Sequence, residues 1–319
     1  LYQRDAYSRA FPASTTKVMT AIVALENIKD MNRVVTLGWR PVSGFGPTSS
    51  LMGLKANETI PLMDILYGLM MRSGNDAAKA LAMETSYEVF GQDTEPSELI
   101  PKFVDLMNQK ALGMNSTHFV TVDGRHDDNH YTTAYDFAVL MRYALQNPVF
   151  AKVIATAEYD VAPTNQHPQG MHFENSNRLI SNKTGDNQSF LYQYCIGGKT
   201  GETNYAGYCL ISACRKDDIT LIAVQFGDSN NSTSKFYRYE VAKKLYDWGY
   251  ENYCAVPVTE FGLQSEFEIQ TAGFSPFDSD YGKLKATADL SGLMIKGSKQ
   301  YLDAIKSDPS GVIVKINTD

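Results

Sequence analysis

The stretch Phe11-Pro12-Ala13-Ser14-Thr15-Thr16-Lys17-Val18-Met19-Thr20 predicts the start of a helix. Apolar residues recur at helical spacing from Val18 to Leu25, and a proline just before them suits a helix entry. Ser14 and Lys17 are one helical turn apart, so their side chains project from the same face at the helix N-terminus. The sequence therefore places a hydroxyl beside an amine where a helix begins.

This pair has the chemistry that serine activation needs. A free hydroxyl is a weak nucleophile, and a neutral amine can take its proton when burial and nearby positive charge lower the lysine pKa. The helix N-terminus also favours developing negative charge. The spacing alone is a weak signal, because Ser232-Thr233-Ser234-Lys235 repeats it and a surface serine beside a solvated lysine is the alternative.

A second motif, Ser73-Gly74-Asn75, lies between two predicted helices. The first of these has Pro61 at its first position and runs to residue 71, and the second follows from Asp76, which can cap it. At such a break a hydroxyl and a carboxamide can point into a cleft. The alternative is an N-cap cluster, and a similar triplet occurs at Ser229-Asn230-Asn231.

A third motif, Lys199-Thr200-Gly201, is predicted to end an apolar strand and open a turn. It offers a cation, a hydroxyl and an unobstructed backbone edge to a bound carboxylate. Lys183-Thr184-Gly185 repeats the triplet, but no strand leads into its polar surroundings. We therefore assign the motif to the later copy.

The pattern of the whole chain predicts an α+β fold. Further helices are predicted at 97–112, 134–145 and 234–250. Strands are predicted at 190–196, 208–214, 219–226, 266–269 and 312–316. We expect a helical lobe and an antiparallel sheet to form one domain, residues 1–252, followed by a small β-rich domain, residues 253–319.

Composition and charge exclude some classes of function. The 319-residue chain has a formal net charge of -7 with both signs interspersed, which argues against a nucleic-acid partner. No apolar run approaches the length that crosses a bilayer, and the start lacks the pattern of a signal peptide. We expect a mature or trimmed chain acting on a small or neutral substrate.

The cysteines are Cys195, Cys209, Cys214 and Cys254, and no two of them form a Cys-x-x-Cys pair. Zinc-ribbon and thioredoxin-like sites are therefore excluded. Cys195 and Cys209 flank one predicted hairpin and could be cross-strand neighbours. Thiols buried as small hydrophobic groups are the alternative, so the sequence leaves the disulfide state open.

The segment His126-Asp127-Asp128-Asn129-His130 has metal-ligand residue types at an i, i+4 spacing. It follows Asp123-Gly124 in a polar loop, has no helix to align the two imidazoles and lacks a His-Glu-x-x-His arrangement. We therefore expect no metal here, and no cofactor.

The three motifs become specific in combination, because they occur in a fixed order on suitable elements. With them the sequence resembles the penicillin-recognising serine enzymes. It is most similar to the low-molecular-mass penicillin-binding proteins that are D-alanyl-D-alanine carboxypeptidases. The resemblance spans residues 1–252 and includes the stretches from His130 to Asp136 and from Arg238 to Tyr250. Gly74 in the second motif is typical of the carboxypeptidases.

The resemblance implies a fold like that of serine β-lactamases and transpeptidases, with a defined set of catalytic residues. Ser14 would attack the carbonyl between two D-alanines, and Lys17 would take its proton. Ser73 and Asn75 would assist proton transfer and positioning. The backbone N–H groups of Ser14 and Glu202 would form the oxyanion hole.

The resemblance also implies how substrate is held. Lys199, Thr200 and Arg238 would bind the terminal carboxylate, with Gly201 allowing its close approach. Arg238 has an alternative as an ordinary helix-surface arginine. His130 falls where the family has a loop bordering the active site, and we do not expect it to be catalytic.

The implied partners are a peptidoglycan stem peptide ending in D-Ala-D-Ala and β-lactams as covalent inhibitors, at the cell envelope outside the cytoplasm. Family members usually have a signal peptide and a C-terminal amphipathic anchor, so both ends are expected to be cut. Membrane association would require a segment outside this chain. A serine β-lactamase is one alternative, but it needs a deacylating loop glutamate, and Glu95 and Glu98 lack the expected pattern. A β-lactam or peptidoglycan sensor of weak activity is another, disfavoured by the intact motifs.

Overall fold

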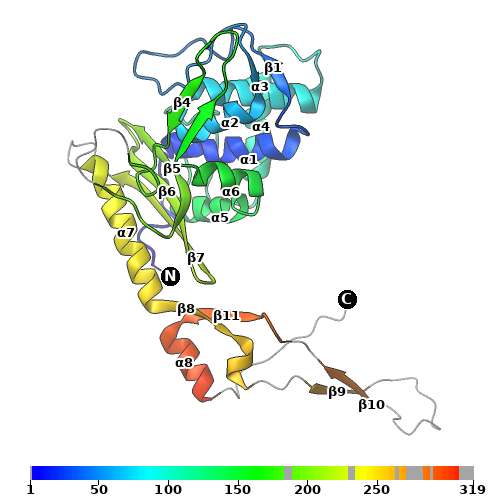
Figure 1. The fold of residues 1–319 in the computed structure, drawn as a ribbon, viewed down its shortest axis with the longest axis vertical. Coiled ribbons are helices and arrows are strands. Elements are labelled where there is room, and N and C mark those ends of the chain that lie inside the picture. Colours follow the sequence, from blue (N-terminus) through cyan, green and yellow to red (C-terminus); the bar gives the residue numbers. More distant parts are fainter. Residues whose placement is uncertain are drawn as a thin grey trace, which may run out of the picture. The chain divides into compact units, whose positions relative to one another are not determined.

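The computed structural model describes residues 2–182, 189–228, 234–262, 266–270, 283–287 and 290–308 (Figure 1). The chain divides into two compact units. The first comprises Leu1–Arg215 and Thr220–Tyr246, and the second comprises Lys216–Ile219 and Asp247–Asp319. The repeated motifs at 183–185 and 229–231, residues 232 and 233 of the second Ser-x-x-Lys, and the predicted strand at 312–316 lie outside the described residues.

Helices make up most of the first unit. A 3-10 turn, Ala13–Thr16, leads directly into α1, Lys17–Asn27, so the helix predicted at Ser14 is confirmed. The other helices are α2 (Leu62–Met71), α3 (Asn75–Phe90), α4 (Leu99–Lys110), α5 (Ala134–Ala144), α6 (Pro148–Ala155) and α7 (Ser234–Asn252). Only α6 among them was missed by the sequence pattern.

Helix α1 lies in the middle of this helical lobe (Figure 1). Every residue from Lys17 to Ala24 is buried, and α1 contacts α2, α3, α4, α5 and α6. A helix covered on all sides must be apolar nearly all round. Lys17 is therefore buried at the start of a helix whose Val18, Met19 and Ile22 belong to the core.

Two predicted helix starts are wrong. Pro61 is the N-cap of α2 rather than its first residue, and α3 begins at Asn75 with Gly74 as its N-cap. Asp76 is therefore not the N-cap of α3, although its Oδ1 also accepts the N–H group of Ala77 at 2.9 Å. Its carboxylate accepts the backbone N–H groups of Met52, Gly53 and Leu54 at 2.8 to 3.0 Å, because buried backbone donors in an irregular segment need a partner.

The main sheet of the first unit is antiparallel, in the order β5-β6-β7. Its strands are β5 (Cys195–Thr203), β6 (Gly207–Lys216) and β7 (Ile219–Asp228), so the two later predictions are confirmed. Two short hairpins pair β1 (Val34–Thr36) with β2 (Thr59–Pro61), and β3 (Glu158–Val161) with β4 (Met171–Glu174).

The first strand of this sheet was predicted in the wrong place. The strand begins at Cys195 instead of Phe190, and Lys199-Thr200-Gly201 lies inside it instead of at its end. Glycines conceal the strand, because they break the alternation by which strands are recognised. At Gly198 a Cβ would overlap the carbonyl oxygen of Ile211 in β6, so the missing side chain lets the two strands approach.

The second unit is small. Its strands are β8 (Tyr253–Pro257), β9 (Glu266–Gln270), β10 (Lys283–Thr287) and β11 (Met294–Ser298), paired as β8 with β11 and β9 with β10. A 3-10 turn, Val258–Phe261, and α8, Lys299–Ser307, complete it around Val256, Phe261 and Leu302. The strand predicted at 266–269 is confirmed. Among the described residues, no helix has the length and apolar character that a membrane span requires.

Candidate active site

A cavity of about 550 Å³ in the first unit brings the three motifs together. Its walls come from the start of the α1 segment, the turn between α2 and α3, strand β5 and helix α7. The lining residues are Ser14, Ser49, Ser50, Leu51, Arg72, Ser73, Ser176, Arg178, Thr200, Gly201, Glu202, Phe236, Arg238 and Tyr239. Lys17, Asn75 and Lys199 are buried, and the two lysines donate hydrogen bonds to serines that line the cavity.

Lys17 lies in direct contact with Ser14. Its Nζ is 2.8 Å from Ser14 Oγ, 2.8 Å from Asn75 Oδ1 and 2.7 Å from the carbonyl oxygen of Asp123. Burial lowers the pKa of Lys17 to about 8, although the negative charges of Asp123 and Asp76 oppose this change. A lysine with this pKa is partly neutral near pH 7 to 8 and can accept the proton of the neighbouring hydroxyl.

The backbone of the second motif turns its serine toward β5. Ser73 has a φ of 59°, a left-handed backbone conformation that residues other than glycine seldom adopt. Its Oγ accepts a hydrogen bond from Lys199 Nζ at 2.9 Å. A Cβ at Gly74 would lie 2.9 Å from the backbone nitrogen of Met52, which is too close. Because Ser73 and Asn75 face the two lysines, the alternative of an N-cap cluster is wrong.

The environment of Lys199 differs from that of Lys17. Besides Ser73 it donates to the carbonyl oxygen of Thr200 at 2.7 Å. Burial, then the positive charges of Lys17 and Arg238, hold the pKa of Lys199 well below its usual range. An anion bound beside it would favour the charged form.

Strand β5 passes close to the 3-10 turn that carries Ser14. A Cβ at Gly201 would lie 3.0 Å from the backbone nitrogen of Ser14 and 3.0 Å from the carbonyl oxygen of Pro12. Ala13, just before Ser14, has a φ of 48°, another left-handed residue at this edge. The glycine therefore brings the Ser14 N–H group and the exposed residue Glu202 to one rim of the cavity.

Arg238 is not a helix-surface arginine. It is buried in α7, and its Nη1 donates to the carbonyl oxygens of Gly201 and Cys209 at 3.2 and 3.3 Å. Its Nε has no hydrogen-bond partner among the described residues. The rings of Tyr208 and Tyr239 lie 5.1 and 5.0 Å from the guanidinium carbon. Arg238 thus lines the cavity and keeps one buried N–H donor without a partner among the described residues.

Sequence reasoning missed several lining residues. Ser176 Oγ is 2.9 Å from Thr200 Oγ1, and the Asn75 N–H group donates to the carbonyl oxygen of Ser50 at 2.8 Å. Ser50 and Ser176 lie in irregular segments without periodicity, so no local pattern indicated them. Arg72, by contrast, directly precedes the second motif and could have been proposed from that position.

His130 contacts the first motif through Thr16. It is buried, its Nε2 lies 2.8 Å from Thr16 Oγ1, and its Nδ1 accepts the N–H groups of Val120 and Thr121 at 3.0 and 3.2 Å. Because Nδ1 accepts, the ring is neutral with its proton on Nε2. Burial lowers its pKa to about 4. The ring of His126 instead stacks on Tyr205 at 3.8 Å.

Two glutamates bear on the β-lactamase alternative. Glu98 lies just before α4 and pairs with Lys102 at 3.6 Å. Neither Glu95 nor Glu98 lines the cavity that holds Ser14. The described structure therefore gives neither carboxylate access to an acyl group on Ser14.

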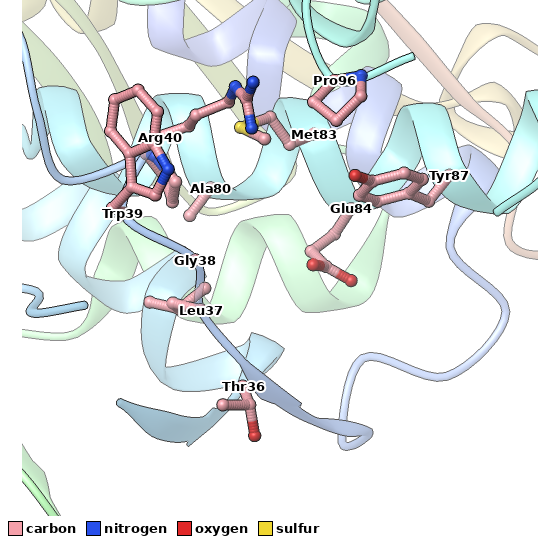
Figure 2. A pocket seen from close by; sticks show the side chains of 11 residues that line it. Thr36, Leu37, Gly38, Trp39, Arg40, Ala80, Met83, Glu84, Tyr87 and Pro96 are labelled. Atoms are coloured by element: carbon pink, nitrogen blue, oxygen red, sulfur yellow. The ribbon is translucent and has the colours of Figure 1, made fainter. Parts of the chain in front are cut away.

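A separate cavity of about 190 Å³ lies between α3 and residues 36–41 (Figure 2). Trp39, Arg40, Glu84 and Tyr87 contribute its largest side chains (Figure 2). No serine or lysine lines it among the described residues. The nucleophile assigned from the sequence, Ser14, thus lines the larger cavity, and the assigned base, Lys17, contacts it there.

Comparisons with known proteins agree with this geometry. Residues 1–230 match the family model for D-alanyl-D-alanine carboxypeptidase. The D-alanyl-D-alanine carboxypeptidase DacD of Salmonella typhimurium is 33% identical, over 79% of this chain and 59% of its own length. The D-alanyl-D-alanine carboxypeptidase DacB2 of Mycobacterium tuberculosis is 34% identical, over 75% of this chain and 74% of its own length.

Solved structures share the fold. The Streptomyces K15 DD-transpeptidase has a TM-score of 0.67 and 29% identity, covering 79% of this chain and 92% of that one. The D-alanyl-D-alanine carboxypeptidase of Mycobacterium tuberculosis H37Rv has a TM-score of 0.64 and 28% identity, covering 79% and 86%. The predicted α+β, transpeptidase-like fold is confirmed. The chain belongs to the D-alanyl-D-alanine carboxypeptidase family, as its three motifs predicted.

Proposed function

We propose that this chain is a serine D-alanyl-D-alanine carboxypeptidase, which removes the terminal D-alanine of peptidoglycan pentapeptides through an acyl-enzyme. The observation that carries the proposal is the 2.8 Å contact between Ser14 Oγ and Lys17 Nζ at the wall of the 550 Å³ cavity. A buried amine with a pKa of about 8 beside a hydroxyl is suited to general-base activation of a nucleophile.

The proposed first half-reaction is acylation. Ser14 Oγ attacks the carbonyl carbon between the two D-alanines while its proton passes to neutral Lys17. The backbone N–H groups of Ser14 and Glu202 stabilise the oxyanion. When the C–N bond breaks, the leaving amine takes a proton delivered from Lys17 with the help of Ser73, and Asn75 positions the reacting groups. D-Alanine departs and an ester with Ser14 remains.

The second half-reaction is hydrolysis of that ester. Water attacks the ester carbonyl, gives up a proton to neutral Lys17, and the Ser14 alkoxide leaves and is reprotonated. The free carboxyl of the shortened peptide is the product. The same acylation with a β-lactam opens the ring and leaves no departing group, so β-lactams are expected to act as covalent inhibitors.

Recognition of the terminal carboxylate is assigned to Lys199, Thr200, Gly201 and Arg238. The buried positive charges of Lys199 and Arg238 and the hydroxyl of Thr200 supply charge-assisted and neutral hydrogen bonds. The absence of a Cβ at Gly201 lets the ligand approach the backbone of β5. These roles are supported by two observations: Thr200, Gly201 and Arg238 line the cavity, and buried Lys199 contacts Ser73 in its wall.

The proposed setting follows from the substrate. We assign catalysis to a domain of residues 1–252 and a separate β-rich domain to residues 253–319. The stem peptide ending in D-Ala-D-Ala lies outside the cytoplasm, so we place the working enzyme in the cell envelope, either secreted or membrane-anchored. A β-lactamase is not favoured, because neither Glu95 nor Glu98 lines the cavity.

The test is an assay of purified protein on a defined pentapeptide. Wild-type protein should release D-alanine and be labelled by penicillin once per chain, and Ser14→Ala should lose both signals. Ser232→Ala, in the second Ser-x-x-Lys copy, is the matched control and should retain both. Undiminished D-alanine release by Ser14→Ala would refute the mechanism. Labelling of wild type without D-alanine release would favour the sensor.

A further inference from the structure

Cys195 and Cys214 lie directly opposite each other on β5 and β6. The Arg215 N–H group of β6 donates to the carbonyl oxygen of Tyr194 at 2.8 Å. The Cys195 N–H group instead donates to the carbonyl oxygen of Tyr192, three residues earlier in the chain, and not across to β6. The cysteines therefore form the non-hydrogen-bonded type of pair, next to a hydrogen-bonded one. In such pairs the Cα atoms are about 4.5 Å apart and the side chains are close, which is within the range that a disulfide spans.

The two thiols already interact. The Cys214 thiol donates a hydrogen bond to the Cys195 sulfur, which is the main reason that the pKa of Cys195 is lowered, against the effect of burial. Cys195 is half-buried and Cys214 is buried. A thiol with a lowered pKa and partial access is the one that attacks a disulfide.

The pair lies on the opposite face of the sheet from the active site. Ser212, two residues before Cys214 and so on the same face of β6, hydrogen-bonds to Tyr246 Oη of α7 at 2.8 Å. Lys199 is paired with Ile211, whose side chain points to the other face, and reaches Ser73 there. Chemistry at the thiols therefore proceeds without contact with the catalytic side chains.

The remaining cysteines do not share this arrangement. Cys209 is opposite Gly201, and Cys254 is opposite Gly297. Burial also raises the pKa of Cys209 to about 12, which suppresses its thiolate. The sequence left open that Cys195 and Cys209 are cross-strand neighbours, and the register of β5 and β6 contradicts that possibility.

We infer that Cys195 and Cys214 are a disulfide-forming site, oxidised by thiol–disulfide exchange with a low-molecular-mass disulfide. The Cys195 thiolate attacks one sulfur of the donor, forms a mixed disulfide and releases one donor thiol. The Cys214 thiol then loses its proton and attacks the Cys195 sulfur, which releases the second donor thiol. Two cysteine thiols are oxidised to one disulfide, and one donor disulfide is reduced to two thiols.

The bond would tie β5 to β6 beside an irregularity in the strand. The register shifts between Cys195 and Gly197, just before the segment that carries Lys199. Closing the loop between the two cysteines restricts the unfolded chain. The oxidised protein should therefore be more stable, with a thermal midpoint higher by about 5 °C or more, and its penicillin acylation rate should stay within about twofold of the reduced form.

The experiment uses the reduced, purified chain and oxidised glutathione. After incubation, remaining thiols are alkylated and peptides are mapped by mass spectrometry. The expected product is a disulfide that links the peptides of Cys195 and Cys214, with no glutathione retained. Thermal unfolding of oxidised and reduced samples then gives the shift in midpoint.

Three variants sharpen the result. Cys214→Ser should stop at a stable glutathione adduct on Cys195, and Cys195→Ser should leave Cys214 largely unmodified. Cys209→Ser is the matched control and should form the linked product as wild type does. A persistent adduct on wild type, no reaction at Cys195, or linkage to Cys209 or Cys254 would each overturn the inference. An unchanged midpoint on oxidation would overturn the stabilising role.

Discussion

Lys17 on helix α1 and Lys199 on strand β5 are both fully buried, yet their surroundings differ. Lys17 donates to three oxygens, and the carboxylates of Asp123 and Asp76 favour its charge. Lys199 donates to two oxygens, and the charged groups that affect it are the cations Lys17 and Arg238. Lys17 has carboxylates near it, whereas the charged groups near Lys199 in the described part of the chain are both cations.

The difference indicates two kinds of function for one residue type. A buried lysine near carboxylates keeps a pKa close to neutral pH, so it can exchange a proton during a reaction. A buried lysine among cations tends to lose its proton. A bound anion favours the protonated, charged form and compensates for the hydration that the amine lost on burial. In the proposed mechanism Lys17 is the base, and Lys199 receives the substrate carboxylate.

Replacing the base should have the largest effect. Lys17→Arg keeps a positive charge but cannot be neutral at working pH. The acylation rate of penicillin should fall by about 10³-fold, within the range of lost general-base catalysis. Stopped-flow acylation of wild type and variant measures it, with the exposed Lys152→Arg as control. A loss below tenfold would remove Lys17 from the role of base.

Replacing the anion-binding lysine should have a smaller effect that depends on the substrate. Lys199→Ala should lower kcat/KM for a pentapeptide with a free terminal carboxylate by about 10²-fold, as expected for a lost charge-assisted hydrogen bond. For the same peptide with an amidated terminus, Lys199→Ala should lower kcat/KM by a much smaller factor than for the free acid. Equal losses with both peptides would assign Lys199 to proton transfer through Ser73 instead.

The neutral imidazole of His130 should make the stability of the fold depend on pH. The pKa of His130 is about 4 when folded, against an ordinary value of 6.5, so the unfolded chain binds a proton that the folded chain does not. The free energy of unfolding should therefore fall as pH decreases from 6.5 toward 4. Between pH 7 and pH 5 this group contributes a loss of about 2 kcal/mol.

Urea unfolding of wild type and His130→Asn at both pH values measures this contribution. The variant should be less stable at pH 7, because Thr16 and two backbone N–H groups lose a partner, but its change between pH 7 and pH 5 should be smaller. A wild-type change no larger than that of the variant would contradict the assignment.

The two lysines should respond to pH in opposite directions. The acylation rate should rise about tenfold between pH 7 and pH 9, as Lys17 with a pKa of about 8 becomes neutral. Affinity for a carboxylate ligand should fall as pH rises, because only protonated Lys199 attracts it. Rates with a β-lactam and Kd values for a non-reactive D-alanine-terminated peptide, measured over this range, separate the two effects. A flat rate profile would count against Lys17 as the neutral base.

Much of the active site could be predicted from short motifs. Ser14 with Lys17 is a matter of helical spacing, and Ser73 with Asn75 requires only a break between helices. The position of Lys199 was harder to predict, because glycines break the alternating pattern of the strand that carries it. Ser50, Ser176 and the orientation of Arg238 could not be predicted, since they depend on backbone contacts between segments far apart in sequence.

The sequence by itself determined the family, the order of the three motifs and most of the helices, because these follow from local spacing and periodicity. Only the tertiary structure decided that α1 is central and buries Lys17, that Lys199 has cations for neighbours, and that Cys195 faces Cys214 instead of Cys209. Burial, charge environment and strand register are set by what packs from elsewhere in the chain. No local pattern contains that information.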